Sequence, residues 1–209
     1  KSYFENVTCL YIADGHHRAA SASRVQKIRS NQNKSHYVDE PYNYFLATIF
    51  PHYDVQILSY NRVVKDLNGL NYREFLSVIE NNFTVNELTE PKKPEKKYSF
   101  SMFMDNVWYD LKAKSQIFKG DKNIYLDAQI LQDYILNPIL NIYDPRISER
   151  IDFVGGVKGL EELERRCNYD AKVAFALHPV SIEDLMSISD EGKVMPPKST
   201  WFEPKLRSG

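Results

Sequence analysis

A helix that opens directly after an apolar run is the feature that most limits how this chain can fold. Residues 7–12 are mainly apolar, and Asp14 and Gly15 separate them from a run of small residues. We expect a strand over 7–12 and a helix over 17–30, where apolar residues recur every three positions. The first amide N–H groups of such a helix lack partners within it. The junction is therefore predicted to face an anionic ligand beyond the carboxyl end of the strand.

Residues 14–18 read Asp-Gly-His-His-Arg and bring charged groups to this junction. Neighbouring histidines on a helix point about 100° apart, which does not match the zinc-binding spacing of four. A phosphate site fits better, because Gly15 permits close backbone approach and Arg18 offers a fork of donors. Asp14 is suited to accept a proton or to hold Mg²⁺. The residues also allow a structural alternative, with Asp14 as an N-cap and the histidines on the surface.

The composition is that of an ordinary globular protein and narrows the choice of partners. The chain has 209 residues, 43% apolar and 26% charged, and 27 Lys plus Arg stand against 28 Asp plus Glu. This balance disfavours binding to nucleic acid or to an anionic membrane. Cys9 and Cys167 lack a metal-binding spacing, and Cys9 is expected to be a buried thiol within a strand. Without a signal peptide or a long apolar run, the protein is expected to be cytoplasmic.

We expect an α+β fold in which helices pack on a mixed β-sheet. The 14 Tyr and 11 Phe residues favour such a sheet-rich fold. The chain is expected to form a single domain over 1–209, or the carboxyl-terminal half of a larger domain, with a mobile loop near 90–97. Further strands are predicted over 42–50, 55–64, 98–104, 107–113, 150–154 and 171–177, and further helices over 71–82, 126–140, 159–167 and 181–190.

Two later segments are secondary candidates for anion binding. A glycine-rich turn at 154–160 presents Lys158, although glycines at a turn are more often present for their backbone freedom. A proline-rich segment at 195–205 is either a packed tail or a strap across a pocket. As a strap it would present three polar residues to an anion, namely Lys198, Ser199 and Thr200.

Three residues near predicted strands receive simpler interpretations. Asn61 and Arg62 lie within a strand and are interpreted as structural. His178 ends another strand and is either an ordinary surface or core residue or a member of the same pocket.

Four segments together resemble a known family. The segments 13–18, 60–67, 152–156 and 195–205 are similar to those of the bacterial and archaeal family called domain of unknown function 1015. The resemblance spans nearly the whole chain. Family members are about twice this length, so the chain resembles their carboxyl-terminal half and the amino-terminal half of the same protein is expected to be missing.

The resemblance implies a function and a set of site residues. Some family members are free L-serine kinases that use ADP or ATP, on a fold similar to ParB and sulfiredoxin. It implies that residues 14–18 lie at the nucleotide phosphates, and that a glutamate base belongs to the missing half. Together with the patterns above, the candidate catalytic residues are Asp14, His16 and His17, with possible Mg²⁺ binding at Asp14. The candidate nucleotide- or phosphate-binding residues are Gly15, His16, His17, Arg18, Lys158, Lys198, Ser199 and Thr200.

The leading hypothesis is a nucleotide-dependent phosphotransferase acting on a small hydroxyl substrate, with free L-serine as the expected acceptor and Mg²⁺ with ADP or ATP as cofactors. One alternative is a non-catalytic regulator that binds a nucleotide or a phosphorylated metabolite. The other is a ParB-like nucleic-acid-binding module, which the balanced charge disfavours.

Overall fold

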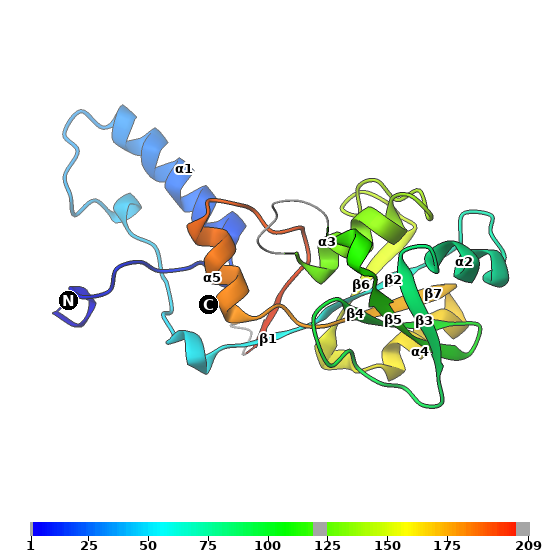
Figure 1. The fold of residues 1–209 in the computed structure, drawn as a ribbon. Helices are drawn as coiled ribbons and strands as arrows, with labels where there is room; N and C mark the ends of the chain where they lie inside the picture. Colours follow the sequence, from blue (N-terminus) through cyan, green and yellow to red (C-terminus); the bar gives the residue numbers. More distant parts are fainter. Residues whose placement is uncertain (1, 119–124, 204–209) are drawn as a thin grey trace. The chain divides into compact units, whose positions relative to one another are not determined.

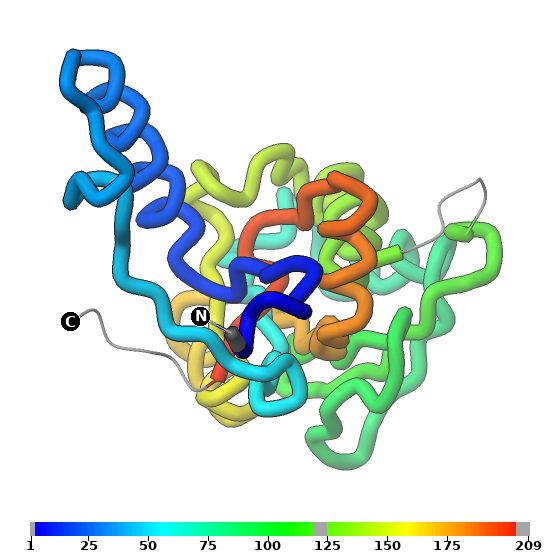
Figure 2. Tube along the Cα trace, turned by 90° about the vertical axis from the view of Figure 1, so that its left-hand side faces the viewer, coloured from blue at the N-terminus to red at the C-terminus, as the bar shows by residue number. Residues whose placement is uncertain are grey.

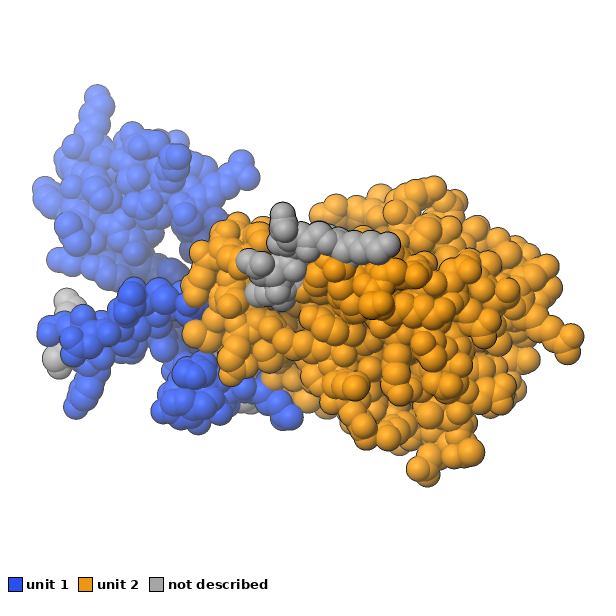
Figure 3. All heavy atoms as spheres, viewed as in Figure 1, with its two compact units in different colours: residues 1–56, 204–209 blue, residues 57–203 orange. Residues whose placement is uncertain are grey.

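The computed structural model describes residues 2–118 and 125–203, and the chain separates into two compact units. Unit 1 comprises the described residues up to Gln56, and unit 2 comprises Ile57–Glu203 (Figure 3). Each unit is described by itself below.

Unit 1 is built around one long helix. Its elements are η1 (Ser2–Phe4), α1 (His16–Gln32), η2 (Pro41–Asn43) and η3 (His52–Asp54). The helix α1 confirms the prediction for 17–30, and the chain returns so that η2 lies beside it (Figure 2). A polar contact joins the two elements, because Gln26 Nε2 donates to Asn43 Oδ1 at 3.2 Å. No described residue of unit 1 is buried, so this unit holds its shape through local helix bonds and surface contacts.

The strands predicted for unit 1 are absent. Residues 7–12 and 42–50 form no strand, and η3 lies between the segments 42–50 and 55–64 that were predicted as strands. Cys9 is exposed rather than buried. A strand needs a neighbour for its amides and carbonyls, and the described residues of unit 1 provide none. The apolar patterns were real, but they correspond to extended chain with exposed side chains such as Leu10 and Phe45.

Unit 2 contains a six-stranded antiparallel sheet and confirms the α+β class. The strand order is β3-β5-β4-β7-β2-β6 (Figure 1). The bounds are β2 (Tyr60–Val64), β3 (Phe83–Leu88), β4 (Ser99–Met104), β5 (Val107–Ala113), β6 (Ile151–Gly155) and β7 (Val173–Leu177). Two short strands, β1 (Gln56–Leu58) and β8 (Trp201–Glu203), pair separately.

The sheet is antiparallel where a mixed sheet was expected, and the reason is the position of β2. The strands β6 and β7 are joined through α4 (Glu161–Tyr169), a connection that would allow parallel pairing. Instead β2 lies between them and pairs antiparallel with both. Every other neighbouring pair in the sheet is antiparallel as well.

Helices cover both faces of this sheet, and the side-chain alternation of the strands supplies both cores. Val64 and Met102 pack in the larger core with α2 and α3, whereas Val63 and Phe103 pack in the smaller core with α4. Successive residues of a strand point to opposite faces, so apolar residues fill both sides of the central strands. The remaining helical elements are α2 (Tyr72–Ile79), η4 (Ser115–Ile117), α3 (Asp127–Leu131), the π-helix η5 (Gln132–Leu136), η6 (Gly156–Lys158) and α5 (Ile182–Asp190).

The helix predicted over 126–140 is shorter and changes its winding. Residues after α3 continue as a π-helix, in which Asn137 N donates to Gln132 O at 3.0 Å. Pro138 has no N–H to donate, and the π-helix ends at Leu136, although Ile139 N still donates to Ile135 O at 3.1 Å.

Local sequence signals predicted several other elements correctly. The hairpin of β4 and β5 turns at Asp105 and Asn106, both with positive φ, and α2 begins after an Asn71 capping box. Ser181 caps α5 by accepting from Asp184 N at 3.1 Å. Strand β3 was not predicted, although it pairs along its whole length with β5.

The segment 90–97 contains no regular element, and its mobility stays a prediction. Within it Lys92 pairs with Glu95 at 2.8 Å, and Ser101 Oγ donates to Lys92 O at 2.5 Å. None of the helices among the described residues is both long enough and apolar enough to cross a membrane.

Candidate functional site

The start of α1 has the geometry of an anion-binding helix terminus. Gly15 is the N-cap, with φ of 81°, and its carbonyl accepts from Ala19 N at 2.9 Å. No side chain caps this end of the helix, so the structural alternative with Asp14 as the N-cap was wrong. The left-handed conformation favours glycine, because a Cβ would crowd the backbone there. The amides of the first turn therefore keep the donor capacity that the sequence predicted, although no strand precedes them.

Arg18 and Asp14 flank this terminus. Arg18 Nη2 lies 3.3 Å from Asp14 Oδ2, and the two side chains are 61% and 54% exposed. A Cβ at Gly15 would lie 3.2 Å from Arg18 Nε and Nη2, so the guanidinium lies directly over the glycine. Exposed ion pairs contribute only about 0–1 kcal/mol to stability. A phosphate group carries more charge than one carboxylate and can compete for the same guanidinium.

His16 and His17 occupy the first turn of α1 and are both exposed. Among residues 2–118 and 125–203, no group of three or more His, Cys, Asp or Glu side chains is placed to hold a metal ion. Asp14 is a single exposed carboxylate at this terminus. That donor set fits Mg²⁺ only in the form in which one carboxylate is joined by substrate phosphates and water.

Unit 2 brings together three of the four segments that carried the family resemblance. Their aromatic rings form a cluster, defined here as Tyr60, Phe153 and Trp201. The ring of Tyr60 lies 5.9 Å from that of Phe153 and 5.4 Å from that of Trp201, both edge-on. The Trp201 ring also lies against Gly155, where a Cβ would come within 2.6 Å of it. The segments 60–67 and 152–156 and the described part of the last segment, residues 195–203, therefore share a structural reason for their residue types; residues 204–205 lie outside the described residues.

Arg62 lies beneath this aromatic cluster and is 4% exposed. Its Nη1 donates to Tyr60 O, and its Nη2 donates to Lys198 O at 3.1 Å. The centre of its guanidinium lies 5.5 Å from the centroid of the Phe153 ring. The sequence analysis interpreted Arg62 as structural. These contacts do link β2 to the described residues 195–203, but the groups that Arg62 contacts, two carbonyl oxygens and an aromatic ring, carry no formal charge.

The proline-rich segment is held by its own backbone and by β2. Ser199 is buried, and its Oγ donates to Pro196 O at 2.6 Å. Lys198 has φ of 57°, and its Nζ lies 5.5 Å from the centroid of the Tyr60 ring. Thr200 is half-buried. The interpretation as a strap fits this course, but the Ser199 hydroxyl is engaged within the segment itself.

Lys158 ends η6 and is exposed. The glycines before it are explained by packing, because a Cβ at Gly156 would come within 2.8 Å of Ser59 O. Lys158 and residues 198–200 belong to unit 2, whereas residues 14–18 belong to unit 1. A common phosphate site for the two groups stays a prediction.

A buried carboxylate that the sequence analysis did not single out, Asp127, lies at the start of α3. Asp127 is 6% exposed, and its Oδ1 accepts from Tyr98 N at 2.9 Å. Its Oδ2 and His178 Nδ1 are buried without a hydrogen-bond partner among the described residues. Burial raises the pKa of Asp127 to about 7, against the lowering effect of the Tyr98 and His178 backbone N–H groups and the Lys97 charge. A helix-starting aspartate is common in any sequence, so no sequence signal marked this one.

Comparisons with known proteins were made for the whole chain. The sequence profile of a family described as "Protein of unknown function (DUF1015)" matches residues 1–139. None of the curated proteins matches.

Solved structures with similar folds include a free serine kinase in complex with AMP, with a TM-score of 0.46 and 16% identity over 91% of this chain and 66% of that chain. A variant of a free serine kinase in complex with ADP has a TM-score of 0.45 and 16% identity over the same shares. A conserved hypothetical protein from Pyrococcus furiosus has a TM-score of 0.45 and 13% identity, over 91% of this chain and 68% of that chain. This chain thus spans less than two thirds of the length of these serine kinases.

Proposed function

Because this chain belongs to the DUF1015 family, whose description is that of a protein of unknown function, we propose that it is part of a nucleotide-dependent phosphotransferase. The observation that carries the proposal is the start of α1, where Gly15 in the left-handed conformation lies under the Arg18 guanidinium. Free L-serine is the proposed acceptor, because the motif segments resemble those of family members that phosphorylate it.

The proposed phosphate contacts follow from charge and geometry. The amides of the first turn of α1 and the Arg18 guanidinium would bind the phosphate oxygens that gain charge during transfer. His16 and His17 are placed in the same turn and would donate to the same oxygens. When bound at Asp14, Mg²⁺ would supply further neutralisation of the phosphate charge.

In the proposed step, one phosphoryl group moves from the nucleotide to the serine hydroxyl. The serine hydroxyl oxygen forms a bond to the terminal phosphorus of ADP or ATP, and the bond from that phosphorus to the bridging oxygen breaks. AMP or ADP leaves with the bridging oxygen, and the hydroxyl proton passes to the Asp14 carboxylate or to a base in the amino-terminal half. Asp14 reaches this role only when phosphate draws Arg18 away from it.

The test is an assay of the full-length protein with L-serine and either ADP or ATP, in which O-phosphoserine is measured by mass spectrometry. We expect turnover in the wild type and a loss of at least 100-fold, roughly the contribution of one general acid–base group, in Asp14→Asn. Arg24→Gln, an exposed substitution on the same helix, is the matched control and should leave turnover unchanged. Absence of O-phosphoserine with both nucleotides would disprove the phosphotransferase proposal.

The second candidate is a non-catalytic regulator that binds a nucleotide or a phosphorylated metabolite. The ion pair between Asp14 and Arg18 favours it, because the guanidinium already occupies the carboxylate, whereas the helix terminus can still bind phosphate. Calorimetry separates the two candidates. Nucleotide binding that is weakened in Arg18→Gln, in a full-length protein without turnover, would support the regulator.

A further inference from the structure

Arg62 is a buried cation without a counter-ion among the described residues. It lies in β2, between β6 and β7, and it contacts two carbonyl oxygens and one aromatic face. The other arginines buried partly in unit 2 behave differently. Arg150 is bound by Asp66, and Arg166 is bound by both Asp152 and Asp170.

A buried charge without a partner is costly, because the protein interior solvates it less well than water does. Burial lowers the pKa of Arg62 to about 10, which still leaves the guanidinium protonated at neutral pH. Its positive charge therefore persists inside unit 2. Carbonyl dipoles and the Phe153 ring offset part of this cost, but they carry no formal negative charge.

A cavity of about 270 Å³ opens onto Arg62. Its wall includes Gln129 and Gln132 from the α3 region and Pro196 and Pro197 from the proline-rich segment. The amide groups of the two glutamines already donate to protein oxygens, so they hold their positions. The cavity is therefore shaped by rigid elements on several sides.

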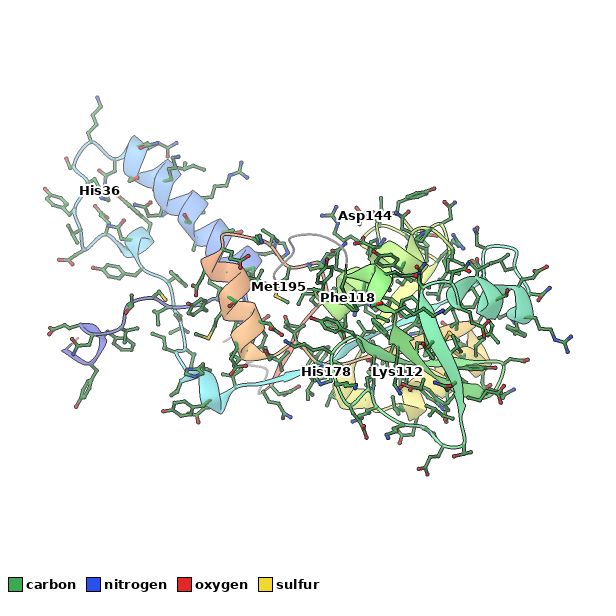
Figure 4. The ribbon with its side chains drawn as sticks, viewed as in Figure 1. His36, Lys112, Phe118, Asp144, His178 and Met195 are labelled. Carbon is green, nitrogen blue, oxygen red and sulfur yellow. The ribbon has the colours of Figure 1, made fainter. Side chains whose placement is uncertain are left out.

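The other charges on the cavity wall cancel each other. Asp144 and Arg146 lie on the loop that follows the π-helix, where Figure 4 labels Asp144. Arg146 Nε donates to Asp144 Oδ1 at 2.9 Å, and Arg146 Nη2 donates to Asp144 Oδ2 at 2.7 Å. This pairing holds the pKa of Asp144 down at about 2, so the pair is neutral as a whole. The charge left on the wall is the single positive charge of Arg62.

We propose that this cavity binds a small oxyanion, the carboxylate or phosphate group of a small metabolite, through Arg62. The volume lies just below the roughly 300–1,000 Å³ of pockets for drug-sized ligands, so a compact metabolite fits better than a nucleotide. The planar guanidinium suits both kinds of oxyanion. The site lies wholly within unit 2 and stands whether or not residues 14–18 bind a nucleotide.

The test is isothermal titration calorimetry of the full chain with sodium phosphate, sodium acetate and L-serine as separate probes, at constant ionic strength set with chloride. We expect saturable binding of at least one probe at millimolar concentration. Saturation with phosphate alone identifies a phosphate ligand, and saturation with acetate or L-serine identifies a carboxylate. Arg62→Met should weaken binding at least tenfold, whereas Arg165→Gln, on the exposed face of α4, should leave it unchanged.

A second variant keeps the test decisive if Arg62→Met fails to fold. Gln129→Phe leaves the contacts of Arg62 with the two carbonyl oxygens and with the Phe153 ring in place, and it puts a bulkier ring on the cavity wall. We expect it to weaken anion binding by a similar factor while circular dichroism remains that of the wild type. The proposal is overturned if the wild type binds none of the three probes at concentrations up to about 50 mM. It is also overturned if Gln129→Phe binds the probes with the same affinity as the wild type.

Discussion

Replacing Asp127 with asparagine should remove a large part of the pH dependence of stability of unit 2. Asp127 is 6% exposed, and among the described residues only its Oδ1 has a hydrogen-bond partner, whereas its Oδ2 has none. Burial raises its pKa from 3.8 to about 7. The nearby charged and titratable groups are the Lys97–Asp184 ion pair, at 2.5 Å, and the imidazole of His178.

The sign and size of the effect follow from proton linkage. Between pH 3.8 and about 7 the folded protein keeps a proton on Asp127 that the unfolded chain has released. Stability from this group is therefore present below pH 3.8 and is lost as the pH rises through about 7. A difference of one bound proton changes the free energy of unfolding by about 1.4 kcal/mol per pH unit. Over the roughly three pH units between the two pKa values this amounts to about 4 kcal/mol.

The assay is urea unfolding of the wild type and Asp127→Asn at a series of pH values from 4 to 8. Asparagine keeps an oxygen that can accept from Tyr98 N. Its buried N–H₂ group lowers the free energy of unfolding by an amount that does not depend on pH. From pH 4 to pH 8 we expect the free energy of unfolding of the wild type to fall by about 4 kcal/mol relative to that of the variant. This difference corresponds to a shift of about 2 M in the urea midpoint. Groups common to both proteins cancel in this difference.

Asp133→Asn, an exposed substitution just after α3, is the matched control and should differ from the wild type by the same amount at every pH. The reasoning is refuted if the difference between wild type and Asp127→Asn also stays constant from pH 4 to 8.

Three further substitutions test the packing and the helix termini. Gly155→Ala should destabilise unit 2 by about 1–3 kcal/mol and alter the tryptophan fluorescence, because the new Cβ would meet the Trp201 ring at 2.6 Å; an unchanged unfolding midpoint would contradict this. Asn71→Ala should cost about 0.5–2 kcal/mol in urea unfolding, since it removes the capping box that Asn71 forms with Glu74, and a smaller loss would mean that tertiary contacts hold α2 in place. Gly15→Ala should weaken nucleotide binding in calorimetry at least fivefold, because it forces the left-handed conformation on a residue with a Cβ; equal affinity would show that this terminus is not the binding site.

The sequence by itself determined the elements whose signals are local. The helix α1, the hairpin of β4 and β5, and the cap at Ser181 each depend on residues close together in the chain. The positive φ values at Asp105 and Asn106 are a property of those residue types at a tight turn. The residue that caps α1 was not identified, because the structural alternative named Asp14 as the N-cap and the structure has Gly15 there.

Strands depend on partners, and there local reasoning failed. The apolar segments 7–12 and 42–50 have strand-like composition but no neighbour within the described part of unit 1. Strand β3 was missed for the converse reason, because its polar residues form a strand only against β5. Strand formation is decided by hydrogen bonds and packing with distant segments, which no window of sequence contains.

Only the tertiary structure decided the environments of Arg62 and Asp127. Arg62 donates to Lys198 O across 136 positions of sequence, and Asp127 meets Tyr98 and His178 from separate elements. An arginine in a strand and an aspartate at a helix start are ordinary in sequence. They acquire unusual chemistry because the fold removes them from water, and the free energy of a charge depends on what surrounds it.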